Sequence, residues 1–467
     1  MEQIEINDTI AAISTPPGVG GIAVIRVSGP KALEIVNSAW TGSDLTKVPS
    51  HTVHLGKYTS KEGDILDEGV ATVFIAPASF TGEDTVEIGI HGSAWIQRTI
   101  LSDLINRGAR IANPGEFTQR AFLNGKIDLA QAEGVADLIA SSSKAAHDLA
   151  LSQTKGTFSK EFDQLRERLI EFASLLELEL DFSEEDVEFA DRTKLQSLCE
   201  EILTKVNRLA DSYHRGSVLK NGVPVVIAGI PNAGKSSLLN LLLEEDKAIV
   251  TDIPGTTRDT IEDTVEIDGI LYRFVDTAGL RDTADEVEGI GVRKAISAIN
   301  KAFVVLWVFD PTQLFDSQLQ AFKEFRIQNP DKNTIVLVNK SDLSDIPNLT
   351  NLTDHIHLSV IPFSTKTGDG LEELLKELKS VCTHDSNTSS DIIVTNARHY
   401  EALTRAAGAL ERVRESLLQD SVSTIPVSAD FIAQDIREAT AYLATITGAI
   451  TTDNLLQSIF SRFCIGK

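Results

Sequence analysis

Short apolar runs alternate with helical patterns between residue 223 and about residue 380. The runs VPVVIAGI, AFVVLWVF, TIVLV and HLSVIPF are brief and rich in β-branched residues, as buried strands are. Between them lie amphipathic stretches such as LEELLKELK, whose apolar positions recur every three or four residues. This alternation predicts an α/β domain in which a mainly parallel sheet carries helices on both faces.

One strand pair of this block is expected to run antiparallel. The segment EDTVEIDGILYRFVDT places Asp268 and Gly269 between two strand-like runs. An Asp-Gly pair in that setting is a strong signal for a two-residue hairpin turn. The sheet should therefore end in a hairpin at one edge.

Long amphipathic helices flank the α/β block, at roughly 127–215 and 396–463. An insertion is tolerated where the ends of the inserted domain lie close together, so the two helical halves should pack as one unit. The first 120 residues show short strands and a helix near 93–107, which predicts a separate α+β domain. The predicted limits are 1–120 for the α+β domain, 121–220 and 382–467 for the two parts of the helical domain, and 221–381 for the inserted domain.

Charge and composition narrow the function. The 68 acidic and 43 basic residues give a formal charge of −25, which excludes uniform attraction to nucleic acid or to an anionic membrane. Apolar runs of eight residues are far below the ~20 that a membrane helix needs. Cys199, Cys382 and Cys464 lie far apart and predict neither a disulfide framework nor a zinc site. With no readable export signal, we expect a cytoplasmic protein without a membrane partner.

The clearest chemistry lies in GIPNAGKSS, which has Gly229, four residues, then Gly234, Lys235 and Ser236. It follows a strand and opens a helix, as a phosphate-binding P-loop does. Glycines let backbone N–H groups approach the phosphates, and Lys235 supplies a positive charge to the outer ones. The hydroxyl of Ser236 can bind magnesium.

Further elements at strand ends point to guanine. In NKSD, residues 339–342, the carboxylate of Asp342 can accept from the ring N–H and the amine of guanine, which adenine does not present together. In DTAG, residues 276–279, the carboxylate can hold the water shell of magnesium and the glycine N–H can contact a terminal phosphate, although the motif alone is a weak signal. Ser364 to Lys366 are expected to close the pocket. The combination predicts GTP and GDP as ligands.

Hydrolysis needs a positioned water and stabilisation of the transferred phosphoryl group. Many GTPases place glutamine directly after DxxG, but this chain has Leu280, which neither donates nor accepts a hydrogen bond. We hypothesise that a monovalent cation, held by loop carbonyls and the Asn232 side chain, supplies the missing charge. The alternative for Asn232 is a turn-forming role, because Asn is common in turns.

These motifs, with TPPGVGGIAVIRVSG near the start, TDIPGTTRD, DTAGLRDTADEVE and the terminal FCIGK, closely resemble the tRNA uridine-modification GTPases called MnmE or TrmE. The resemblance implies potassium-dependent GTP hydrolysis on dimerisation of the G domains. It also implies a homodimer that works with the flavoprotein MnmG, or GidA, in a heterotetramer. Together they would add an aminomethyl or carboxymethylaminomethyl group to carbon five of the wobble uridine of certain tRNAs.

The resemblance also assigns residues. Asn232, Thr251, Ile253 and Thr256 would hold potassium, Ser236 and Thr257 would bind magnesium, and Glu288 would orient the attacking water. The full expected GTP-binding set is Asn232, Ala233, Gly234, Lys235, Ser236, Ser237, Thr251, Asp252, Ile253, Pro254, Gly255, Thr256, Thr257, Asp276, Thr277, Ala278, Gly279, Asn339, Lys340, Ser341, Asp342, Ser364, Thr365 and Lys366.

The family's amino-terminal domain binds a tetrahydrofolate derivative that provides a one-carbon unit. Its folate-binding positions match Arg26, Glu87, Lys126 and Lys467. The set is chemically sensible, because cations can pair with the carboxylates of a folate tail and a Glu can accept from the pterin edge. Each residue also has an ordinary structural alternative, since charged side chains are mostly exposed. Cys464 is either a participant in one-carbon transfer or a small packing residue.

A second function class remains open, a regulatory GTPase of ribosome assembly. Such a protein usually carries a readable RNA-binding appendage, for example a basic KH-like domain. The regions that flank the α/β block here are acidic or neutral. The composition therefore favours the tRNA-modification hypothesis.

Overall fold

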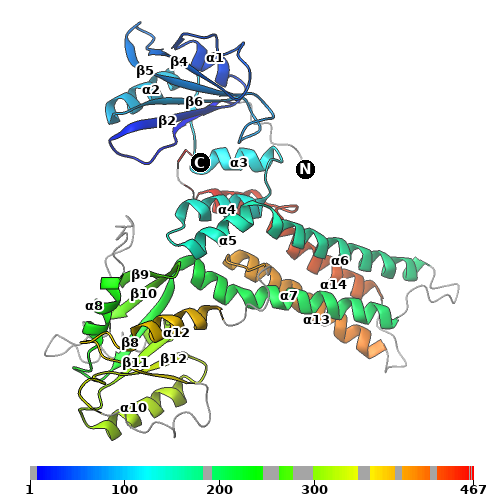
Figure 1. The fold of residues 1–467 in the computed structure, drawn as a ribbon. Coiled ribbons are helices and arrows are strands. Elements are labelled where there is room, and N and C mark those ends of the chain that lie inside the picture. The colour runs from blue at the N-terminus through cyan, green and yellow to red at the C-terminus, as the bar shows by residue number, and fades with distance from the viewer. Residues whose placement is uncertain are drawn as a thin grey trace, which may run out of the picture. The chain divides into compact units, whose positions relative to one another are not determined.

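The computed structural model describes residues 8–181, 192–245, 262–276, 298–344, 358–383, 392–420, 429–461, 463 and 465–466 (Figure 1). The chain forms two compact units. The first unit comprises residues 1–136, 153–191 and 423–467, and the second comprises residues 137–152 and 192–422. Both units draw on segments from either side of the predicted insertion. The predicted domain limits stay a prediction.

The first unit contains a seven-stranded sheet with the order β3-β4-β5-β6-β2-β1-β7. The central strands pair antiparallel, and β1 pairs in parallel with the short edge strand β7. Its strands are β1 (Ile10–Ile13), β2 (Gly20–Ser28), β3 (Trp40–Thr41), β4 (Thr52–Thr59), β5 (Ile65–Phe74), β6 (Thr85–Gly92) and β7 (Arg110–Ile111).

Two helices, α1 (Ala32–Asn37) and α2 (Ala94–Asn106), pack on this sheet and close its core. Ile25 and Ile88 of adjacent strands are fully buried together with Ile100 and Leu104 of α2. The alternation of buried and exposed positions along β2 follows from the two-residue period of a strand, which sends every second side chain into the core.

Helices complete the first unit. They are α3 (Glu116–Leu123), the first part of α4 (Leu129–Ala140), α6 (Thr157–Asp181), α14 (Ala429–Thr447) and α15 (Asp453–Phe460). Helix α6 packs along α14, which is far from it in sequence, and α15 packs against α3. Gly115, at the start of α3, has a positive φ of 69°, and an added Cβ there would lie 2.7 Å from the Phe460 carbonyl oxygen. The close approach of α15 thus requires glycine.

The second unit contains a six-stranded sheet with the order β13-β12-β11-β8-β10-β9. Neighbouring strands from β13 to β10 pair in parallel, and β9 pairs antiparallel with β10. The strands are β8 (Val223–Gly229), β9 (Glu262–Ile267), β10 (Ile270–Asp276), β11 (Val304–Phe309), β12 (Asn333–Val338) and β13 (Ser359–Pro362).

Both faces of this sheet are covered by helices, α8 (Lys235–Glu245), α10 (Phe315–Gln328) and α12 (Leu371–Thr383). Val225 and Ile227 of β8 belong to a core with α8 and α12, whereas Val226 belongs to a second core with Phe322 and Phe325 of α10. Because successive strand residues point to opposite faces, β8 is buried on both sides, as a central parallel strand is.

Long helices accompany this α/β body. They are α7 (Arg192–Asn221) and α13 (Ala397–Asp420), while α5 (Lys144–Thr154) contributes its residues up to 152. Helices α7 and α13 come from opposite sides of the insertion and pack together. The Tyr213 and Tyr400 rings stack at 4.6 Å, and the Val394 amide donates to Ser212 Oγ at 3.0 Å. Helices from the two flanks do pack in pairs, α7 with α13 here and α6 with α14 in the first unit, but the pairs belong to different units, so packing of the helical halves as one unit stays a prediction.

The predicted fold class is confirmed: an α+β region, long helices and an inserted α/β module with a mainly parallel sheet. The hairpin predicted at Asp268 and Gly269 joins β9 to β10, and both residues have positive φ, 51° and 82°. The sequence reading missed β1, β3, β4 and β7. Among the described residues, no helix combines the length and apolar character needed to cross a membrane.

Candidate functional site

The predicted P-loop lies between the end of β8 and the start of α8. Gly229 has a φ of 145°, and an added Cβ would lie 2.4 Å from the Val308 carbonyl oxygen of the neighbouring strand. The side chain of Lys235 points back over the loop, where its Nζ donates to the carbonyl oxygens of Gly229 (3.2 Å) and Ile230 (2.8 Å). The loop thus places an ammonium group beside the N-terminus of α8, and both favour an anion.

Asn232 lies at the tip of this loop with a positive φ of 62° and is exposed. Asn adopts the left-handed region more readily than most residues, so it serves the turn here. Its exposed amide also remains available to a ligand, and the two roles predicted from the sequence are compatible. Ser236 and Ser237 are exposed on the first turn of α8.

A buried asparagine connects the P-loop to the NKSD segment. Asn339 is 1% exposed, and its Nδ2 donates to the Ala233 carbonyl oxygen at 2.7 Å. Its Oδ1 accepts from the Thr365 amide at 3.0 Å. An added Cβ on Gly234 would lie 2.2 Å from Asn339 Nδ2, so glycine is required for this contact. The structure thus brings three of the predicted elements together at the carboxyl ends of parallel strands, where α/β sheets bind ligands.

The residues predicted to read guanine have distinct environments. The carboxylate of Asp342 is exposed, and its Oδ1 accepts from the buried Ser364 hydroxyl at 2.9 Å. Ser341 donates its amide to the Phe363 carbonyl oxygen at 3.1 Å, while Lys366 is exposed. Ser364 therefore orients Asp342, in keeping with its predicted place at the pocket edge.

Part of the predicted set lies outside the described residues. Asp276 ends β10 and pairs in register with Ile227, but only its backbone is described. The residues outside the described part are Thr251, Asp252, Ile253, Pro254, Gly255, Thr256, Thr257, Thr277, Ala278, Gly279, Glu288, Cys464 and Lys467. The roles expected of them remain predictions.

In the first unit, the structure pairs two of the predicted folate residues. Arg26 on β2 faces Glu87 on β6, and Glu87 Oε1 accepts from Arg26 Nε (2.9 Å) and Nη2 (2.7 Å). The guanidinium carbon lies 5.4 Å from the Phe80 ring centroid and 5.5 Å from that of Phe117. Cation–π contacts of this kind hold a guanidinium flat against an aromatic wall.

Lys126 lies against the loop 77–82 that carries Phe80. Its Nζ donates to the Pro77 carbonyl oxygen at 2.9 Å, and an added Cβ on Gly82 would lie 3.2 Å from Lys126 Cγ. Asn124 Nδ2 donates to the Thr81 carbonyl oxygen at 2.7 Å. Arg26, Glu87 and Lys126 are therefore grouped around one loop.

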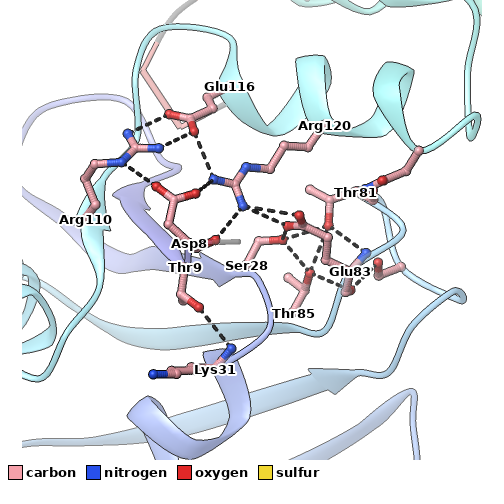
Figure 2. Close-up of polar contacts among 12 residues, drawn as sticks. Asp8, Thr9, Ser28, Lys31, Thr81, Glu83, Thr85, Arg110, Glu116 and Arg120 are labelled. Carbon is pink, nitrogen blue, oxygen red and sulfur yellow. Dashed lines mark hydrogen bonds and ion pairs between the residues drawn. The ribbon is translucent and has the colours of Figure 1, made fainter. Parts of the chain in front are cut away.

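A buried ion cluster anchors the same loop (Figure 2). Arg120 of α3 is fully buried and donates to Asp8 Oδ1 (2.6 Å), Glu116 Oε1 (3.0 Å) and both carboxylate oxygens of Glu83 (3.2 Å). Arg110 adds a second cation against Asp8 and Glu116. We call these five residues the Arg120 cluster.

Burial alone would raise the pKa of the Asp8 and Glu116 carboxyls, but hydrogen bonds from Arg110 and Arg120 outweigh it and hold both pKa values below their ordinary range. Glu83 also accepts from Ser28 Oγ at 2.8 Å. The sequence reading did not single out Arg120. The feature that could have indicated it is a single positively charged residue at a core-facing position of the helix EFTQRAFL.

The end of the chain lies in the same unit, beside β1. Gly466 accepts from the Ser14 hydroxyl through its carbonyl oxygen at 3.1 Å, and an added Cβ would lie 2.3 Å from the Ile13 carbonyl oxygen. Glycine is thus required next to the terminal lysine.

Comparison with known proteins assigns the chain to a family. The model described as "GTP-binding protein TrmE N-terminus" matches residues 9–126, and the model "MnmE helical domain" matches residues 129–464. A protein of Parabacteroides distasonis named tRNA modification GTPase MnmE is 48% identical, over 98% of this chain and 100% of its own length. The chain belongs to the MnmE family.

A second MnmE relative, from Cytophaga hutchinsonii, carries the same name and is 49% identical over 99% of this chain and 98% of its own. The family predicted from the motifs is thereby confirmed. Among solved structures, the G domain of T. maritima FeoB is 25% identical over 34% of this chain and 98% of that chain, with a TM-score of 0.27.

Proposed function

We propose that this MnmE-family chain binds and hydrolyses GTP and that the hydrolysis serves tRNA modification. One observation carries the nucleotide site: Asn339 Nδ2 donates to Ala233 O at 2.7 Å, so phosphate-binding and base-reading segments form one site. The tRNA role rests on the family. Its relatives are named tRNA modification GTPases, and they match this chain over almost their full lengths.

Different residues of the described part would contact different parts of the nucleotide. Backbone N–H groups at the start of α8 favour the phosphates, helped by the positive end of the helix dipole. Lys235 Nζ, now bonded to two loop carbonyls, would exchange them for outer phosphate oxygens. Asp342, oriented by Ser364, would accept from the guanine edge.

Two metal ions belong to the proposal. When bound, magnesium and potassium would neutralise charge on the reacting phosphates. Ser236, whose exposed hydroxyl starts α8, is a suitable hard-oxygen ligand for magnesium together with Thr257. The exposed amide of Asn232 would hold potassium with Thr251, Ile253 and Thr256, and Glu288 would orient the water that Leu280 cannot.

Exchanging potassium for sodium tests this scheme. GTP turnover by the full chain at equal ionic strength should fall by about tenfold or more in sodium, because a lost cation contact costs more than ~1.4 kcal/mol of transition-state stabilisation. Asn232→Ala should lower the rate in potassium and change the rate in sodium little. Equal rates in the two salts would contradict potassium dependence.

We further propose that the first unit binds a tetrahydrofolate derivative. Support comes from Arg26, Glu87 and Lys126, which surround the loop 77–82, and from Gly466, which brings the chain end to β1. Glu87 would accept from the N–H and amine edge of the pterin, and the lysines would pair with the glutamate tail. The modified nucleotide would carry an aminomethyl or carboxymethylaminomethyl group on the wobble uridine. Forming it would need the flavoprotein MnmG, bound to a homodimer of this chain in a heterotetramer. We expect these complexes in the cytoplasm.

Calorimetric titration of 5-formyltetrahydrofolate into the full chain tests the folate site. We expect Glu87→Gln to weaken binding by about tenfold or more, because the charged carboxylate that accepts from the pterin edge becomes a neutral amide with only one acceptor oxygen. Glu68→Gln, a change on the same sheet, is the matched control and should bind as the unaltered chain does. Unchanged affinity in Glu87→Gln would remove this residue from the site.

A further inference from the structure

A fully buried carboxylate lies directly after β11, outside every predicted motif. Asp310 Oδ1 accepts from the Thr312 amide (3.0 Å) and hydroxyl (2.6 Å), and Oδ2 accepts from Gln313 Nε2 (2.7 Å) and Lys340 Nζ (2.5 Å). Its side chain is 0% exposed, whereas that of Lys340 is 30% exposed. The lysine of NKSD is therefore the cation that neutralises Asp310.

The backbone of Asp310 is fixed as firmly as its carboxylate. Gln318 of α10 is 2% exposed, accepts from the Asp310 amide at 2.9 Å and donates to the Asp310 carbonyl oxygen at 2.8 Å. Because both the backbone N–H and the carbonyl oxygen of Asp310 are hydrogen-bonded to Gln318, Asp310 has little freedom to shift toward Lys340. In this ion pair, Asp310 therefore fixes the position of the Lys340 ammonium.

Lys340 needs such a restraint. Its φ is 62°, in the left-handed region that non-glycine residues rarely occupy without support from their surroundings. It stands between Asn339, which contacts the P-loop, and Ser341, which bonds to Phe363. With its ammonium tied to Asp310, the direction of the apolar stem of Lys340 is fixed at its far end, two residues before Asp342 in the same segment.

We infer that Asp310 is the positioning residue of guanine recognition, holding Lys340 so that its methylene stem forms one wall of the slot for the base. A lysine can cover a flat ring with its stem while its charge lies elsewhere. Loss of Asp310 would release the stem and leave the partly exposed Lys340 ammonium without its ion-pair partner. This inference rests on the proposed guanine-nucleotide site and adds a residue to it.

Titration of fluorescent GDP into full-length variants tests the coupling. Asp310→Asn should weaken GDP binding by about tenfold, which corresponds to ~1.4 kcal/mol. Lys340→Ala should weaken it at least as much. The double variant should bind no more weakly than Lys340→Ala alone, because residues that act through one another are not additive. GTP turnover by Asp310→Asn should show a raised KM with an unchanged kcat.

Two further variants separate positioning from folding. Thr312→Val removes one hydrogen bond to the same carboxylate but leaves the ion pair, and it should bind GDP within about twofold of the unaltered chain. Lys340→Met keeps an apolar stem but cannot pair with Asp310. It should lose most of the affinity that Lys340→Ala loses, and it gives a result even if Asp310→Asn fails to fold.

Three outcomes would overturn the inference: unchanged GDP affinity in Asp310→Asn, a double variant whose loss is the product of the single losses, or unaltered affinity in Lys340→Met. Failure of the unaltered chain to bind GDP would instead overturn the proposed nucleotide site. The two failures are therefore told apart in one set of titrations.

Discussion

At the scale of residues, the molecule places charge in its interior where segments must be joined. Arg120 joins Asp8, Glu83 directly after the loop 77–82, and Glu116 of α3. Asp310 joins β11 to NKSD through Lys340. Removing one member of such a group leaves the remaining charges with fewer partners, which costs about 1 to 3 kcal/mol. These residues therefore fix positions as well as stabilise the fold.

The Arg120 cluster predicts acid sensitivity of the first unit. The pKa values of Asp8 and Glu116 are lowered, so their stabilisation is fully present above the ordinary carboxyl pKa of about 4 and is lost as pH falls further. Urea unfolding of a Trp307→Phe variant, in which Trp40 and Trp95 report on the first unit, should show falling stability below about pH 4.

Glu116→Gln supplies the matched comparison for that experiment. At neutral pH it should lower the free energy of unfolding by about 1 to 3 kcal/mol, because Arg110 and Arg120 lose a charged acceptor. Its stability should then depend less on pH in the acid range. A variant with the same pH dependence as the parent would show that Glu116 does not carry the effect.

Sequence reasoning identified the candidate ligand-binding motifs better than the residues that support them. The P-loop and NKSD have fixed spacings with a chemical reason, so Lys235, Asn339 and Asp342 were predicted together. Arg120 and Asp310 were missed because a lone charge in a sequence is usually exposed, and each has a charged partner thirty or more positions away along the chain. Only the fold brings those partners together.

At the scale of elements, strong periodicity was a sufficient guide. The buried strands β8, β11 and β12 and the hairpin at Asp268 and Gly269 follow from apolar runs and turn chemistry. Strand β4 was missed because its sequence TVHLGKYT mixes apolar and polar residues: Val53 and Leu55 are 61% and 70% exposed, and Tyr58 alone of its large side chains is buried. The two-residue strands β3 and β7 carry too few residues for any pattern. Pairing with a neighbour, and not local sequence, defines them.

At the scale of the whole molecule, the candidate nucleotide site depends on segments spread over more than 130 positions. Asn339 joins the P-loop near residue 233 to the segment near residue 365. The acidic charge of −25 remains a constraint on the tRNA role, because it leaves any contact with tRNA to a local surface or to a partner. Guanine selection is the claim on which the proposed GTPase activity and the Asp310 inference both depend.

The most direct test of that claim is nucleotide competition on the full-length chain and its Asp342→Asn variant. The unaltered chain should bind GDP and discriminate against xanthosine diphosphate by about a hundredfold or more, since a carboxylate accepts from an amine but repels a carbonyl oxygen. In Asp342→Asn, the new amide donor should reverse this preference. Equal binding of ADP and GDP by the unaltered chain, or an Asp342→Asn variant that still prefers GDP, would contradict the account.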